Sequence, residues 1–277
     1  MQSSQYIHNR QCFHKDMLCN TKVFLFLAGV VSILGIEEIM ESELHVYAHF
    51  FTTDQRVEFL SLVNQIYAEI ALINYTFPGE IESSYRHSIN AAVLMNKTFH
   101  LAKASSPEDF RITYLEELLN NNNSTVQALV VANLVDETLR KYGNAYNLGI
   151  DLTNMSNMAM TDIDLMSPHD RKGHSDNQGN SENKLQLVNI EDYQSAQLLS
   201  GQAVQIFEQI LKPLSQIDNH TSSGNSSNAV YVSKLENGLI ELNNILNNVT
   251  NPQELMMIVH TQIHPGLQLA YNLESGR

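Results

Sequence analysis

The sequence is poor in cysteine, proline and glycine, and it lacks tryptophan. Its two cysteines, Cys12 and Cys19, both lie near the N-terminus, so the rest of the chain has no internal disulfide and no thiol chemistry. Twelve glycines and six prolines in 277 residues are too few for an architecture built on many tight turns. These shortages favour a helical protein.

Basic residues are the scarcer charge, because 16 Lys and Arg face 30 Asp and Glu, for a formal net charge of -14. Residues 1–36 hold Arg10, Lys15 and Lys22 against Asp16 alone, so the acidic excess falls on the remainder of the chain. An acidic surface repels phosphate backbones and anionic lipid headgroups. We therefore expect no nucleic-acid partner.

Long apolar runs are absent, with one exception near the N-terminus. Residues 23–36, VFLFLAGVVSILGI, carry no charge, and they follow Lys22 and precede Glu37 and Glu38. Positive charge before the run and negative charge after it predict that residues 1–22 stay in the cytoplasm and the rest lies outside. The run is shorter than the roughly 20 residues of a spanning helix and is typical of a signal-peptide core.

A cleaved signal peptide and a retained membrane anchor both stay open, and the chain can begin at Met1 or at Met17. The expected location is therefore the cell membrane, crossed once with the C-terminal region outside, or the extracellular space. Eight Asn-x-Ser/Thr sites fit a glycoprotein surface: Asn74, Asn96, Asn122, Asn123, Asn154, Asn219, Asn225 and Asn248.

Apolar residues in the exported part recur with the 4-3 spacing of packed amphipathic helices. The predicted stripes are Val57, Leu60, Val63, Ile66 (or Tyr67), Ile70 and Ile73; Ile81, Tyr85, Ser88, Ala92, Met95, Phe99 and Ala102; Ala196, Leu199, Ala203, Ile206 and Ile210; and Val232, Leu235, Leu239, Leu242, Leu246 and Val249. Residues 126–135, VQALVVANLV, are apolar on nearly all sides, which predicts a helix buried on several faces.

Several landmarks occur twice and in the same order, which predicts an internal duplication. They are QIYAEI (65–70) and QIFEQI (205–210), the helix starts SSPEDF and TNPQEL, and the tetrapeptide AYNL at 145–148 and 270–273. In the two helix starts, Ser106 and Asn251 are the expected N-caps, with Pro107 and Pro252 at the first helical position.

The predicted fold is all-α, with up-and-down helices in two related bundles or in one pseudo-symmetric bundle. It comprises a first repeat at 45–149, a flexible linker at 150–189 and a second repeat at 190–277, after the N-terminal targeting or anchor helix. A shorter linker, residues 218–228, is expected between two helices of the second repeat.

A methionine-rich stretch in the linker is a candidate copper site, because thioether and imidazole ligands suit Cu(I). Its possible ligands are Met155, Met158, Met160, Met166, His169 and His174. The alternative is that the methionines are pliable packing residues in a short amphipathic turn.

Two histidine pairs, HVYAH and HTQIH, have the spacing that puts both rings on one helix face. His45 with His49, and His260 with His264, are therefore candidate ligands for zinc or copper, and Met257 is expected on the face of the second pair. The alternatives are ordinary helix-end histidines, or histidines that sense pH.

The sequence lacks the HExxH, Glu-x-x-His, GxSxG, P-loop, GxGxxG and CxxC motifs of common enzymes. We therefore expect a non-enzymatic extracytoplasmic binding or interaction protein, with a small ligand or a protein partner held between the two repeats. The alternative is a copper or zinc binding protein. The helical stripes also allow a homodimer, although packing within one chain explains them as well.

Overall fold

The computed structural model describes residues 55–76, 79–103, 123–154, 186–221, 226–248 and 252–273, and these residues contain helices but no strand. The helices are α4 (Gln55–Thr76), α5 (Ile81–Lys103), α8 (Ser124–Ala145), α9 (Ile190–Ile206), α10 (Lys212–Thr221), α11 (Ser226–Leu246), α12 (Pro252–Ile258) and α13 (His264–Tyr271). Two π turns, η5 (Phe207–Leu211) and η6 (Val259–Ile263), join α9 to α10 and α12 to α13. The all-α prediction is confirmed over these residues.

The targeting segment at 23–36, the helix start at Ser106 and most of the linker at 150–189 lie outside the described residues. All of the described residues belong to one compact unit, which runs from 46 to 277. None of the helices that the structure describes combines the length and the apolar character needed to cross a lipid bilayer. In the second half, α12 begins at Pro252, as the sequence predicted for that helix start.

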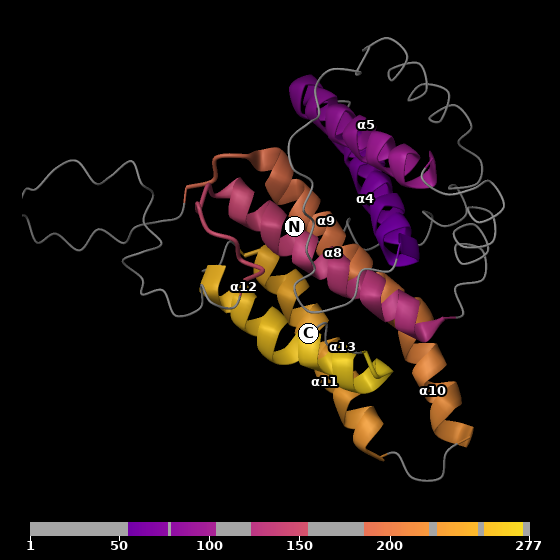
Figure 1. Ribbon diagram of the computed structural model, residues 1–277. Helices are drawn as coiled ribbons and strands as arrows, with labels where there is room; N and C mark the ends of the chain where they lie inside the picture. The colour runs from indigo at the N-terminus through magenta and orange to yellow at the C-terminus, as the bar shows by residue number, and fades with distance from the viewer. Residues whose placement is uncertain are drawn as a thin grey trace, which may run out of the picture. The chain divides into compact units, whose positions relative to one another are not determined.

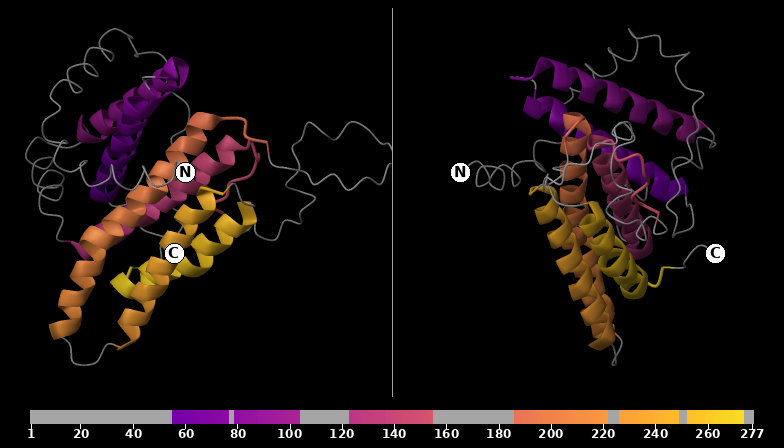
Figure 2. Two further views of the ribbon diagram at one scale, coloured as in Figure 1. Left: turned by 180° about the vertical axis from the view of Figure 1, so that it is seen from behind. Right: turned by 90° about the vertical axis from the view of Figure 1, so that its left-hand side faces the viewer.

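Helix α8 is at the centre of the fold. It packs against α4, α9, α12 and α13, and Figures 1 and 2 show α9 running alongside it. Its start is capped by Asn123, whose side-chain oxygen accepts a hydrogen bond from the backbone N–H of Val126 at 3.1 Å. Val130, Val131 and Leu134 have no exposed surface, which confirms the prediction of a helix buried on several faces.

Helices α4 and α5 form a hairpin, but the face that α5 buries matches the predicted stripe only at Ala92. Ile81, Tyr85 and Phe99 of the predicted stripe are exposed, whereas Ser84 and His87 are buried. The hydroxyl of Ser84 lies 3.4 Å from the backbone oxygen of Ile73, which shows how closely the small residue approaches α4. Small and polar residues therefore make the contact, and an apolar row faces solvent.

The predicted stripe on α4 is correct only in its first half. Val57 and Leu60 are buried, but in the second half Ala68, Glu69 and Leu72 are buried instead of Ile70 and Ile73. The buried carboxylate of Glu69 is the physical reason, because its hydrogen-bond partners hold it against α5 and α9.

The π turn η5 shifts the buried face of the helix that contains it. Ala196, Leu199 and Ala203 are buried as predicted. Beyond them Phe207 and Leu211 are buried in place of Ile206 and Ile210, which are only partly buried. An i→i+5 turn contains one residue more than an α-helical turn, so the buried positions move by one. The structure thus corrects this stripe after residue 203.

The stripe on α11 is confirmed from Val232 to Leu246, since Leu235, Leu239 and Leu242 are buried together with these two residues. Helix α13 crosses α11 closely where it carries a glycine. A Cβ atom on Gly266 would lie 2.9 Å from the Cβ atom of Leu235 and 3.2 Å from its Cα atom. Helices α10 and α11 also extend into the predicted linker at 218–228, as far as Thr221 and from Ser226.

The two AYNL segments end their helices with the same geometry. Asn147 and Asn272 are left-handed, with φ of 48° and 51°. The next N–H closes the helix end in both, because Leu148 donates to the oxygen of Gly143, and Leu273 to that of Gln268, each at 3.1 Å. The Ala, Tyr and Leu of both segments are buried and both Asn are exposed.

Candidate functional site

Glu69 on α4 and His87 on α5 form a buried pair of ionisable side chains. Oε2 of Glu69 and Nδ1 of His87 are 2.7 Å apart. His87 has an exposed fraction of 0% and Glu69 is almost as deeply buried. The hairpin brings the two together, because each lies on the face of its helix that meets the other.

Helix α9 closes this cluster from the other side. The hydroxyl of Ser195 donates to Oε1 of Glu69 at 2.7 Å, and Nε2 of His87 lies 3.0 Å from Oε1 of Gln194. The amide of Asn90 on α5 donates to Oε2 of Glu69 at 3.4 Å. Side chains from three helices therefore meet around one carboxylate and one imidazole.

The surroundings of His87 favour its charged form. An acceptor oxygen faces each ring nitrogen, and only the imidazolium donates from both. Burial lowers the pKa of His87, but the hydrogen bonds to Glu69 and Gln194 and the charges of Glu69 and Glu191 outweigh burial and leave the pKa raised above its ordinary value of 6.5. The cluster therefore retains a proton that a free histidine would lose near neutral pH.

Although the cluster contains serine, histidine and an acid, their order differs from that of a nucleophilic triad. In such a triad the imidazole lies between the hydroxyl and the carboxylate and removes the hydroxyl proton. Here Glu69 lies between Ser195 and His87, so the serine proton points to a carboxylate and the imidazole faces Gln194. The arrangement can hold three helices together and can store a proton.

A surface pocket of about 420 Å³ opens next to this cluster, where α5 and α9 both begin. Its lining is Glu80, Glu82, Ser83, Arg86, Leu187, Val188, Ile190 and Glu191. Ser83 connects the pocket to the cluster, because its hydroxyl lies 3.4 Å from the same Gln194 oxygen that faces His87. The pocket therefore lies over a fixed polar floor.

Hydrogen bonds fix the backbone that carries the aliphatic lining residues Leu187, Val188 and Ile190. The N–H groups of Val188 and Asn189 both donate to the backbone oxygen of Ala145, at 2.8 and 3.0 Å. Asn189 also caps α9, with its side-chain oxygen accepting from the N–H of Asp192 at 3.1 Å. These bonds fix the backbone, yet the side chain of Val188 remains 65% exposed.

The charged wall of the pocket is dominated by carboxylates. The guanidinium of Arg86 pairs with Glu82 at 2.9 Å and approaches Glu191 at 3.6 Å. The hydrogen bond to Glu82, followed by the charges of Glu191 and Glu82, raises the pKa of Arg86. With Glu80 included, three carboxylates face one guanidinium, and the pocket has a formal excess of two negative charges.

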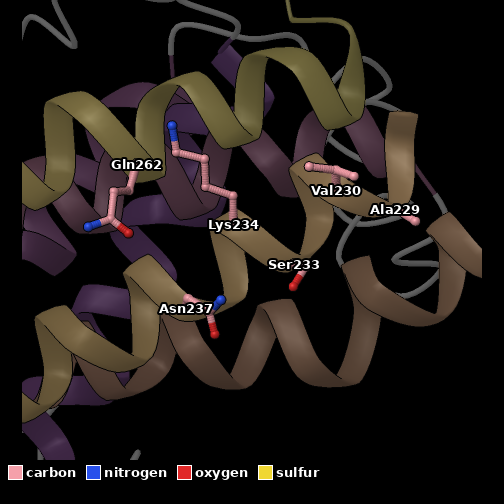
Figure 3. A pocket seen from close by; sticks show the side chains of 6 residues that line it. All are labelled: Ala229, Val230, Ser233, Lys234, Asn237 and Gln262. Carbon is pink, nitrogen blue, oxygen red and sulfur yellow. The ribbon is translucent and has the colours of Figure 1, made fainter. Parts of the chain in front are cut away.

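A second pocket, of about 470 Å³, lies along α11 and has Gln262 of η6 at its edge (Figure 3). Its lining is Ala229, Val230, Ser233, Lys234, Asn237 and Gln262. Lys234 is the one charged residue in this lining. None of the side chains described above as bonded to Glu69 or His87 lines this second pocket. The smaller pocket is therefore the better candidate for a specific binding site.

The predicted histidine pair on the last helix does come together, in a buried position beside α8. The ring centroids of His260 and His264 are 5.2 Å apart, and Nε2 of His264 lies 3.1 Å from Oδ1 of Asp136. Nε2 of His260 lies 3.5 Å from the oxygen of Leu152. Burial and then the neighbouring His264 lower the pKa of His260, against smaller opposite effects of Leu152, Asp136 and Asp151.

Met257 does not join this pair, contrary to the sequence prediction. It is 55% exposed, whereas both imidazoles are buried. The prediction assumed α-helical spacing, but the π turn η6 begins at Val259 and changes the phase of the helix between Met257 and the histidines. No group of three or more His, Cys, Asp or Glu side chains in the described ranges is arranged to hold a metal ion.

The remaining candidate ligands lie outside the described residues: His45, His49, Met155, Met158, Met160, Met166, His169 and His174. Copper or zinc binding by them stays a prediction. Sequence reasoning missed Glu69, His87 and Gln194, because a polar residue on an amphipathic helix normally faces solvent. The sequence carries no signal for them, because the ambiguity between Ile66 and Tyr67 in the stripe on α4 does not point to a buried carboxylate.

Comparisons of the chain with protein-family models, with curated proteins and with solved structures find no match.

Proposed function

We propose that this chain is a non-enzymatic helical binding protein that acts outside the cytoplasm, either secreted or held at the membrane by residues 23–36. The observation that carries the proposal is the pocket at the starts of α5 and α9, where exposed aliphatic side chains stand on an anchored backbone. Exposed aliphatic groups beside fixed polar groups are typical of binding surfaces.

The buried clusters support a binding role over a catalytic one. His87 and His264 each meet an acid from another helix inside the packed fold, at 2.7 and 3.1 Å. Buried polar contacts between helices can fix the relative positions of those helices. In this proposal the buried pairs keep the helices in position, and the solvent-facing pocket binds the partner.

We also propose that the fold arose by duplication of a helical unit. The support is the AYNL segment, which ends α8 and α13 with the same left-handed Asn and the same pattern of buried and exposed residues. Each proposed repeat then consists of a hairpin followed by a helix with this ending, and α8 and α13 pack against each other.

Site-specific photo-crosslinking in the cell that produces the protein tests the binding role. A photoreactive phenylalanine analogue replaces Val188 in the pocket or, as a control, Ile240, an exposed aliphatic residue on α11. We expect one discrete adduct at position 188 on irradiation and none at position 240. Equal labelling at both positions, or no adduct at position 188, would contradict the proposal.

A further inference from the structure

The pocket at the starts of α5 and α9 has an aliphatic wall and a charged wall. One wall is aliphatic and consists of Leu187, Val188 and Ile190, all of them exposed large apolar residues. The other wall is charged and consists of Glu80, Glu82, Arg86 and Glu191. A complementary ligand presents apolar groups to the first wall and positive charge to the second.

The exposed apolar surface extends from the pocket along α5. Ile81 is 76% exposed, and Tyr85 follows it one turn later. Both alternate with the lining residues Glu82 and Arg86, so apolar and charged groups lie side by side on this helix. A single small cation would leave this row uncovered, whereas a peptide with several side chains can cover it.

Hydrogen bonds within the chain hold the residues around the pocket in place without a ligand. Ser83 at its floor is tied to Gln194, and the backbone of Val188 is tied to Ala145. A pocket that is already ordered loses less conformational entropy on binding. Its volume of about 420 Å³ accommodates one or two amino-acid side chains.

We propose that this pocket binds a basic peptide segment of a partner protein, in which lysine or arginine alternates with aliphatic residues. This inference rests on the proposed binding function and names the class of its partner. The basic groups face Glu80 and Glu82, and the aliphatic groups contact Val188 and its neighbours.

Fluorescence anisotropy with a labelled Lys/Leu peptide and the full-length chain in a neutral detergent tests the assignment. We expect saturable binding above the detergent blank, which weakens as salt is added because exposed charges are screened. The double variant Glu80→Gln/Glu82→Gln should weaken binding about fourfold to 25-fold, since each exposed charge pair contributes about twofold to fivefold and the two factors multiply. Val188→Ser should weaken it by a similar factor by removing apolar contact.

The control variant is Glu208→Gln, which removes an exposed acid that does not line the pocket and should leave the affinity unchanged. A peptide with Glu in place of Lys should not bind. Equal affinity for the two peptides, or equal effects of the pocket and control variants, would overturn the assignment. A discrete crosslink at position 188 together with no binding of the basic peptide would keep the binding function and remove this partner class.

Discussion

The buried imidazole of His87 couples the stability of the fold to pH. Its pKa is raised in the folded chain above the ordinary value of 6.5, so the folded state binds this proton more tightly than the unfolded chain does. The stabilisation is complete below the unfolded pKa and is lost as pH rises through the folded pKa. We expect the free energy of unfolding to fall as pH rises above about 6.5, as measured by urea unfolding of the full-length chain.

The variant His87→Gln should remove this alkaline loss and lower the free energy of unfolding at pH 6 by about 3 kcal/mol, because Glu69 then stays buried without its counter-charge. His100→Gln replaces an exposed histidine of the same helix and serves as the control, with no expected effect. If the free energy of unfolding of His87→Gln still fell with rising pH as in the parent chain, a group other than His87 would be responsible for that fall.

The pKa of His260 is shifted in the opposite direction from that of His87, so the same urea measurements at several pH values separate the two effects. Burial and His264 lower its pKa, so the unfolded chain binds this proton more tightly. Its contribution is complete above the unfolded pKa of 6.5 and is lost as pH falls below it. His87 and His260 thus limit stability from opposite sides of neutral pH, and replacing His260 by Gln should reduce only the acid-side loss.

At the scale of the helix, the close crossing of α11 and α13 depends on a glycine. Gly266→Ala places a Cβ atom 2.9 Å from a side-chain atom and 3.2 Å from the Cα atom of Leu235, so the two helices must move apart. We expect a loss of about 1–3 kcal/mol in the free energy of unfolding, measured in urea.

The matched control is Gly143→Ala in α8, where the added Cβ atom would meet Leu152 at an ordinary distance of 3.6 Å. Alanine favours helix over glycine, so this variant should be neutral or up to about 1 kcal/mol more stable. Equal effects of Gly266→Ala and Gly143→Ala would show that backbone propensity, and not the close crossing, sets the response.

The helices themselves could be predicted from the sequence because apolar spacing is a local property, and α8 and α11 bury the residues that it indicated. The predicted helix faces were wrong around η5 and η6, because one extra residue in a π turn changes which residues share a face. Nothing in the local sequence distinguishes Ile206 from Phe207 as the buried residue. The outcome depends on which of them fits against α8, which packs on η5.

The Glu69–His87 cluster could not be predicted for a different reason. Its members come from three helices, and the bond between Ser195 and Glu69 joins residues 126 positions apart in the chain. A buried polar residue becomes recognisable only when its partner is known. The sequence therefore indicated the pair His260 and His264, which lie four positions apart, and gave no indication of the pair that a hairpin assembles.

For the whole molecule, the described helices share one apolar core, but they do not contribute to it equally. Every residue of α8 from Val126 to Ala132 is buried, whereas α5 buries mainly small and polar residues. Helix α5 contacts α4 along its length and touches α9 near the cluster around His87. The hairpin is therefore held to the rest of the fold by α4 and by polar contacts of α5 with α9, namely the cluster around His87 and the pair of Arg86 with Glu191.

This difference predicts that the α4–α5 hairpin opens more easily than α8, and more easily at higher pH. Deprotonation of His87 weakens its bonds to Glu69 and Gln194. Most contacts of α8 are apolar, and the pKa of His260 beside it is lowered, so rising pH does not remove these contacts. Hydrogen exchange read by mass spectrometry, corrected for intrinsic rates, should show protection of α5 falling between about pH 6 and pH 8 while α8 keeps its protection. In His87→Gln the protection of α5 should be low at both pH values. If α5 and α8 lost protection together in the parent chain, the proton on His87 would govern global unfolding, and the hairpin would not be a separate unit.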